Sequence, residues 1–221
     1  MIHSWIRGAA LGATALVLAA QSALTQAEVQ LGRESGGDFS VSVMSWWEIP
    51  FRTVVRQRYD FSCGSAAVAT ILTHHYDRPT GEQEPFKAMW AKGDKELIRK
   101  VGFSMFDMKD YLTDLGYTTE GFRLKVADLQ KIQRPLIVLL DLNGFKHFVV
   151  IKGISADRVL TGDSVLGLTQ YSTRDFEKMW NGIALAIVKT PEPKRPKFNM
   201  ASDWGPWSQA PLEEGNDALA V

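Results

Sequence analysis

The stretch Arg56–Leu72, RQRYDFSCGSAAVATIL, holds Cys63, the single cysteine of this 221-residue chain. Asp60 and Ser62 lie just before it, and side-chain oxygens at such positions are typical of residues that begin a helix. The apolar residues that follow recur at helical spacing as far as Leu72. The stretch therefore predicts a helix with Cys63 in its first turn.

A cysteine at the start of a helix lies beside unpaired backbone N–H groups and the positive end of the helix dipole, which favour a thiolate. A lone cysteine cannot form a disulfide within the chain. In an exported protein it indicates either pairing with another molecule or a free reactive thiol. A small buried side chain used only for packing is the alternative.

A thiolate nucleophile requires a base, and the chain offers His3, His74, His75 and His147. His3 lies in an N-terminal segment that we expect to be removed. His74 and His75 lie about 16 Å along the predicted helix from Cys63, at 1.5 Å per residue, so neither reaches the thiol. His147, in the strand-like sequence GFKHFVVIKG, remains as the candidate base, with a hydrogen-bonded core histidine as the alternative.

Two further side chains complete a candidate site. Asp163 ends the strand predicted after that of His147 and could orient the imidazole, with Asp141 as the rival acid. Gln57, six residues before Cys63, could donate a hydrogen bond to the oxygen of a carbonyl under attack. A surface position on a strand is the alternative for Gln57.

The order of the predicted elements indicates an α+β fold. Helical periodicity covers residues 85–115 with a break at Gly102, and strand-like segments follow from Pro135 onward, with a turn at Asn143–Gly144. Helices followed by strands that short turns connect predict an antiparallel sheet. Before the cysteine, residues 41–58 predict one or two short extended segments.

The composition divides the chain into four parts. Residues 1–27 have the basic start, apolar stretch and small-residue end of a signal peptide, with cleavage after Ala27; a retained membrane anchor is the alternative. Residues 28–45 predict a flexible lead-in, residues 46–190 the folded domain, and residues 191–221 a Pro-rich, disordered tail. The expected location is the periplasm.

The charge balance excludes some partners. The chain has 25 basic and 25 acidic residues and no basic stripe, which argues against nucleic acid and against stable membrane binding after signal cleavage. Neighbouring helical positions point about 100° apart, so His74 and His75 make a poor metal site. We expect neither a metal nor another cofactor.

These residues resemble the C39 peptidase family, papain-like cysteine proteases best known as leader-cleaving domains of bacteriocin transporters. The resemblance covers about residues 54–188 and rests on Gln57, CGSAA from Cys63, HFVV at His147 and GDSVLG around Asp163. It implies a helical part that bears the nucleophile and an antiparallel sheet that bears the base. By resemblance, Cys63 is the nucleophile, His147 the base, Asp163 the orienting acid and Gln57 the oxyanion donor. The family usually has proline after the aspartate, where this chain has Ser164.

The resemblance implies a cysteine endopeptidase that processes exported proteins. An exported domain standing alone is most similar to the C39 peptidases of functional-amyloid secretion systems, which implies components of such a system as partners. The family preference implies a cleavage site rich in glycine or alanine. A peptide-binding module without proteolytic activity, and acyl transfer to an amine by the same site, are the alternatives.

Overall fold

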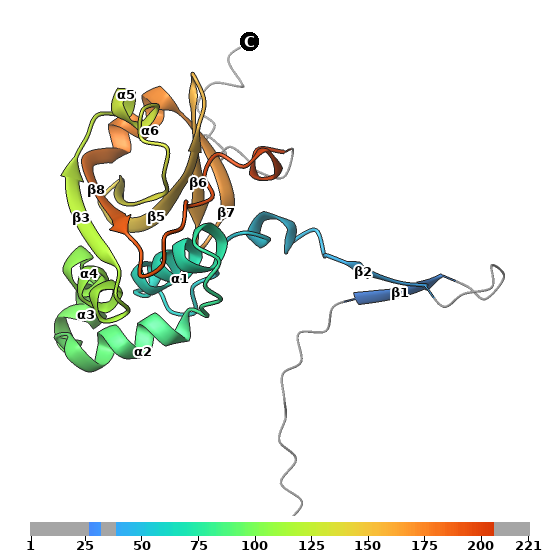
Figure 1. Cartoon of the computed structure of the whole chain (residues 1–221), viewed down its shortest axis with the longest axis horizontal. Helices are drawn as coiled ribbons and strands as arrows, with labels where there is room; N and C mark the ends of the chain where they lie inside the picture. The colour runs from blue at the N-terminus through green and yellow to red at the C-terminus, as the bar shows by residue number, and fades with distance from the viewer. Residues whose placement is uncertain (1–26, 32–38, 206–221) are drawn as a thin grey trace, which may run out of the picture. The chain divides into compact units, whose positions relative to one another are not determined.

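The computed structural model describes residues 27–31 and 39–205, and the chain forms two units that divide after Met44 (Figure 1). In the first unit, strands β1 (Ala27–Leu31) and β2 (Phe39–Val43) pair in antiparallel fashion. The lead-in that the sequence predicts to be flexible therefore holds a short hairpin. The predicted signal peptide, apart from Ala27, lies outside the described residues.

The second unit begins with a short 3-10 helix and a group of four α-helices. Their bounds are η2 (Ile49–Phe51), α1 (Cys63–His75), α2 (Gln83–Lys92), α3 (Lys95–Val101) and α4 (Met105–Asp114). The first turn of α4 is fixed by a capping box in which Ser104 and Asp107 each bind the other's backbone N–H. The region predicted as helical is thus divided into three helices, with a break near Gly93 in addition to the predicted break at Gly102.

A six-stranded antiparallel sheet follows, in the spatial order β3-β8-β4-β5-β6-β7. The strands are β3 (Thr118–Arg123), β4 (Leu136–Leu142), β5 (Phe145–Ile154), β6 (Arg158–Asp163), β7 (Gly167–Ser172) and β8 (Trp180–Lys189). Helices α5 (Val126–Leu129) and α6 (Thr173–Met179) interrupt the run of strands. The predicted α+β class with an antiparallel sheet is confirmed.

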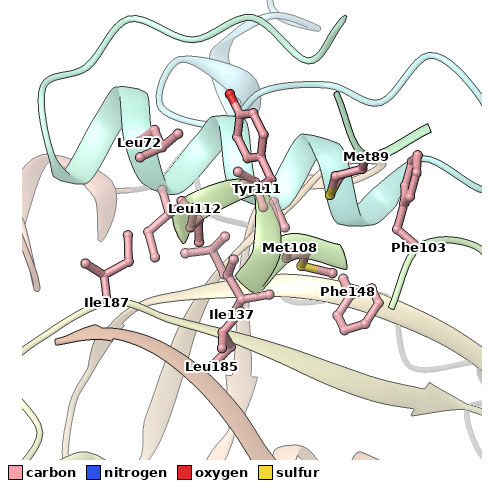
Figure 2. Packing of buried hydrophobic residues seen from close by; sticks show 14 of the residues in the cluster. Leu72, Met89, Phe103, Met108, Tyr111, Leu112, Ile137, Phe148, Leu185 and Ile187 are labelled. Atoms are coloured by element: carbon pink, nitrogen blue, oxygen red, sulfur yellow. The ribbon is translucent and has the colours of Figure 1, made fainter. Parts of the chain in front are cut away.

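The second unit has three layers, with the sheet between two groups of helices (Figure 1). On one face α1, α2 and α4 bury a core with residues such as Ile137, Phe148 and Leu185 of the sheet (Figure 2). On the other face, Phe176 of α6 packs against residues such as Val149. The alternation of side chains along each strand supplies both cores, since successive residues point to opposite faces.

Small residues let α1 lie close to its neighbours. A Cβ atom added at Gly64 would come 2.8 Å from the Met108 side chain and 3.1 Å from that of Phe103. Eleven of the thirteen residues of α1 are buried. A residue larger than glycine at position 64 would therefore require Met108 and Phe103 to move.

The hairpin between β4 and β5 has the turn that the sequence predicts. Asn143 and Gly144 both have positive φ, 54° and 92°. These angles belong to the two-residue turn whose twist matches that of the strands it joins. The turn fixes the register of β5, and so the position of His147 opposite Leu140.

Two local predictions differ from the structure. Between residues 41 and 58 the chain is extended only as far as Val43, and the rest forms turns and η2, in which Pro50 occupies the first turn. Proline fixes φ near the helical value and removes a backbone donor, which suits a short helix better than a strand. The edge strand β7 is not predicted, because GLTQYS lacks a clear apolar alternation.

Part of the tail that the sequence predicts to be disordered is ordered in the structure. The sequence places its start at residue 191, whereas the structure keeps Lys197 to Trp204 on the domain, a segment we call the C-terminal strap. The Lys197 N–H donates to the His75 carbonyl at 2.9 Å, and the Asn199 N–H donates to the Lys152 carbonyl at 2.8 Å. Residues 206–221 of the predicted tail lie outside the described residues. Among the described residues, no helix is both long and apolar enough to span a bilayer.

Candidate active site

Cys63 is the first residue of α1 and only 7% of its surface is exposed. The preceding residue, Ser62, does not cap the helix with its side chain. Its hydroxyl instead bonds the backbone of Tyr59, accepting from the N–H at 3.1 Å and donating to the carbonyl at 2.9 Å. The first backbone N–H groups of the helix have no acceptor within the helix, so the helix start that bears Cys63 favours negative charge.

His147 lies near the start of β5, a strand that packs against α1, and is buried. Its Nε2 lies 3.0 Å from Oδ1 of Asp163 at the end of β6. The ring of Phe145, more than half exposed, stacks beside the imidazole with ring centres 6.0 Å apart. The contact between His147 and Asp163 that strand adjacency predicts is therefore present, and Phe145 shields one side of it.

Asp163 is held by the turn that follows it. Its Oδ1 accepts from the backbone N–H groups of Val165 at 2.7 Å and Leu166 at 3.1 Å. Burial raises the pKa of Asp163, but the hydrogen bonds and charge of His147, together with these N–H groups, lower it overall. The side chain is therefore an ionised carboxylate directed at the imidazole.

The contact between Asp163 and His147 raises the pKa of the histidine. Burial lowers the pKa of His147, but hydrogen bonds with Asp163 and Cys63, and the charges of both, raise it from 6.5 to about 9. His147 is therefore an imidazolium at neutral pH, and a cation at this position can stabilise a thiolate on Cys63.

The second ring nitrogen of His147 has no settled partner. Nδ1 is buried and, among the described residues, makes no hydrogen bond. The Cys63 thiol nevertheless acts on the pKa of His147 as a hydrogen-bonding neighbour. Hydrogen bonds between nucleophile and base are often loose before substrate binds. Nδ1 is thus the nitrogen that can exchange a proton with Cys63, while Nε2 is held by Asp163.

Gln57 precedes α1 and is joined to the turn after Asp163. Its Oε1 accepts from the Ser164 hydroxyl at 2.7 Å, and its Nε2 donates to the Tyr59 carbonyl at 3.0 Å. A backbone bond from the Gln57 N–H to the Ser164 carbonyl, 3.2 Å long, runs parallel to these. A continuous series of contacts therefore joins Gln57, Ser164, Asp163, His147 and Cys63.

The remaining candidates lie elsewhere. The carboxylate of Asp141 pairs with Lys146 and accepts from the Gly144 N–H, which together lower its pKa. His75 lies at the far end of α1, where Nε2 contacts Nζ of Lys152 at 3.1 Å. Across the described part of the chain, no group of three or more His, Cys, Asp or Glu side chains could hold a metal ion.

Two features of this region do not follow from the sequence reasoning. In the sequence, Ser164 stands out only because the family usually has proline at this position. Nothing in the local sequence predicts its bond to Gln57. Lys152 is buried, with Nζ 3.0 Å from the Thr53 carbonyl and 3.4 Å from Oδ2 of Asp203. Its position offers a signal, since strand alternation places it on the same face as the apolar Phe148 and Val150.

Comparison with known proteins adds to this geometry. Residues 52–192 match the Peptidase C39 family. The chain is 42% identical over 153 residues to the "Probable functional amyloid protease FapD" of Pseudomonas aeruginosa, a match that covers 69% of this chain and 68% of that protein. It is 41% identical to the protein of the same name from Pseudomonas fluorescens, with 62% and 61% covered, so about two thirds of each relative is matched.

A solved structure is similar in fold. The peptidase domain of Streptococcus ComA, described as a bifunctional ABC transporter involved in quorum sensing, superposes with a TM-score of 0.53 at 21% identity. The match covers 61% of this chain and 96% of that domain. The helical part followed by an antiparallel sheet is thus the architecture of a C39 peptidase domain.

Proposed function

This chain belongs to the Peptidase C39 family, and we propose that it is a cysteine endopeptidase that uses Cys63 as its nucleophile. The observation that carries the proposal is the buried pair of His147 and Asp163, 3.0 Å apart, on strands beside the helix that begins with Cys63. A buried imidazole with a fixed acid on one nitrogen and a thiol near the other is the arrangement that activates a cysteine.

The reaction begins with the thiolate of Cys63 and the imidazolium of His147. The sulfur attacks a peptide carbonyl, and the oxygen that becomes negative accepts from the Cys63 N–H and from the Gln57 amide. His147 then gives its proton to the departing amine, and the C–N bond breaks to leave a thioester. Water, deprotonated by His147, attacks the thioester, the C–S bond breaks to release the carboxylic acid, and the thiolate and imidazolium are restored.

For the substrate, we infer an exported protein of a functional-amyloid secretion system. Two relatives above 40% identity bear the name "Probable functional amyloid protease FapD", which supports this class of substrate. The signal-like sequence of residues 1–27 supports a periplasmic location. Cleavage next to small residues is expected from the family resemblance.

Cleavage of a proteome-derived peptide library, read by mass spectrometry of the new chain ends, tests the proposal and does not require the natural substrate. We expect the wild type to create ends after a restricted set of small residues. Cys63→Ala should create none while keeping its melting temperature within a few degrees, because a small residue replaces a small one. Asp141→Asn, in an exposed ion pair on the same sheet, is the matched control and should cleave like the wild type.

Two outcomes would contradict the proposal. Cleavage that persists in Cys63→Ala would show that the thiol is not the nucleophile. Peptides retained by the folded wild type but never cleaved would identify a peptide-binding module instead.

A further inference from the structure

We propose that Ser164 is a positioning residue for the oxyanion site, because its hydroxyl fixes the side-chain amide of Gln57 with Nε2 available to the reacting carbonyl. This inference rests on the proposed function, in which Gln57 stabilises the oxyanion. Ser164 is 4% exposed and lies directly after Asp163. No role for it follows from the family pattern, which usually has proline there.

The surroundings of the amide decide its orientation. The carbonyl of Tyr59, 3.0 Å from Nε2, can only accept a hydrogen bond. The amide nitrogen must therefore face Tyr59, which turns Oε1 toward Ser164. The Ser164 hydroxyl is 2.7 Å from Oε1 and donates to it, since an amide oxygen has no hydrogen to give.

An amide nitrogen has two hydrogens, and only one of those on Gln57 is used by Tyr59. The second is free to meet the oxyanion that forms when Cys63 attacks. Without the Ser164 hydroxyl, Oε1 would lose its donor and the amide would be held by Tyr59 alone. The second N–H would then be spread over several orientations, and its contribution to the transition state would fall.

Ser164 also lies between the His147–Asp163 pair and Gln57. Its neighbour Asp163 holds Nε2 of His147, and its own backbone carbonyl accepts from the Gln57 N–H at 3.2 Å. One short turn therefore sets both the orienting acid and the oxyanion donor. The side-chain bond is the part of this connection that a substitution can remove without changing the backbone.

Acylation by p-nitrophenyl acetate tests the proposal without requiring a natural substrate. The thiolate of Cys63 attacks the ester carbonyl, the C–O bond breaks, and p-nitrophenolate leaves, so its absorbance reports a step that passes through an oxyanion. Ser164→Ala should lower the acylation rate about threefold to tenfold, as loss of one hydrogen bond typically does. Ser164→Thr keeps the hydroxyl and should restore most of the rate.

A double-mutant cycle separates positioning from general damage. Gln57→Ala alone should lower the rate by about 10² to 10³. In that background Ser164→Ala should have no further effect, because the amide that it positions is gone. With a cleavable peptide, the loss in Ser164→Ala should fall on kcat rather than KM, since the oxyanion exists only in the transition state.

Two controls complete the design. Alkylation of Cys63 by iodoacetamide forms no oxyanion, so its rate should be the same in Ser164→Ala and the wild type. Ser172→Ala removes another hydroxyl, one that binds Asp175 at the start of α6, and should lower the melting temperature but not the acylation rate.

Losses that add in the double variant would overturn the proposal, because Ser164 would then act independently of Gln57. Slower alkylation in Ser164→Ala would also overturn it, by showing that the serine acts on the thiolate. Failure of the wild type to cleave any peptide would contradict the proposed function alone, since ester acylation is measured separately. A wild type that is alkylated but not acylated would overturn the positioning role itself.

Discussion

At the scale of single residues, the two ring nitrogens of His147 have different surroundings and so different uses. Nε2 is held by Asp163, whereas Nδ1 is buried without a hydrogen-bond partner in the described part of the chain. Asp163 therefore fixes the orientation of the ring through Nε2, and Nδ1 remains for the neighbouring thiol of Cys63.

The first residue-scale prediction concerns the reactivity of the thiol. Iodoacetamide at pH 6 should alkylate Cys63 faster in the folded protein than in the urea-unfolded chain. A protonated His147 beside the sulfur favours the thiolate, whereas an isolated cysteine is almost wholly protonated at that pH. Because the chain has one cysteine, the labelled fraction measured by mass spectrometry reports this site alone.

Two aspartates provide the variants for this measurement. Asp163→Asn should slow the folded-state reaction, because it removes the carboxylate that raises the pKa of His147. Asp141→Asn should leave the rate unchanged, because that carboxylate is bound to Lys146. Protection of Cys63 in the folded state, with labelling only after unfolding, would instead identify a buried structural thiol.

Residue types and local patterns are enough to predict the contact between His147 and Asp163. Few histidines are available as a base. A short turn joins the strand of His147 to the strand that ends at Asp163, so the two strands are expected to pair side by side. The bond between Ser164 and Gln57 could not be predicted, because the partners are 107 positions apart and neither has a pattern that requires the other. Only the folded backbone brings them together.

At the scale of elements, β5 connects the candidate site with the C-terminal strap. His147 lies near one end of the strand, and near the other end Lys152 reaches Asp203 of the strap at 3.4 Å. Thr53 donates to the same carboxylate at 2.9 Å. Burial lowers the pKa of Lys152 to about 8, although Asp203 counteracts this effect.

The corresponding prediction is that Asp203→Asn lowers the free energy of unfolding by about 3 kcal/mol, because it leaves a buried ammonium without its charged partner. Urea unfolding measures this change. The matched control is again Asp141→Asn, whose ion pair is exposed and contributes about 1 kcal/mol or less. Equal effects of the two substitutions would show that the strap is not anchored through Asp203.

The strap is a part of the predicted tail that composition does not identify as ordered. Pro191, Pro193 and Pro196 just before the strap, and polar residues within it, predict disorder, since such a composition buries little apolar surface. Its contacts are made by backbone groups, by Phe198 and Trp204, which pack against buried apolar clusters, and by polar side chains such as Asp203, which is 3% exposed. The polar contacts depend on buried groups that folding brings from distant positions, such as Lys152 for Asp203. The sequence does not indicate which groups these are.

At the scale of the whole molecule, two buried histidines give the stability opposite dependences on pH. Burial, and next the charge of Lys152, lower the pKa of His75 from 6.5 to about 3, so below pH 6.5 the unfolded chain binds a proton that the folded one does not. The pKa of His147 is raised to about 9, so above pH 6.5 the folded chain holds a proton that the unfolded one has lost. Stability therefore falls on both sides of that pH.

We expect the free energy of unfolding, measured by urea titration from about pH 5 to pH 8, to be greatest near pH 6.5. His75→Gln should reduce the fall in stability on the acid side but not abolish it, because burial also lowers the pKa of His74 from 6.5 to about 4. His147→Gln should reduce the fall in the free energy of unfolding between pH 6.5 and 8. At higher pH, loss of the Lys152 proton in the folded chain makes this free energy rise with pH instead. A profile that both variants leave unchanged would contradict these assignments.

The packing of α1 against β5 also determines when the site comes into existence. Cys63 begins the first α-helix of the domain, but His147 follows 84 residues later and Asp163 later still. A chain synthesised from its N-terminus presents the cysteine long before its base, and contacts between such distant positions form late in folding. The unfinished chain therefore holds the proposed nucleophile without its proposed base, and the two meet only when β5 packs against α1.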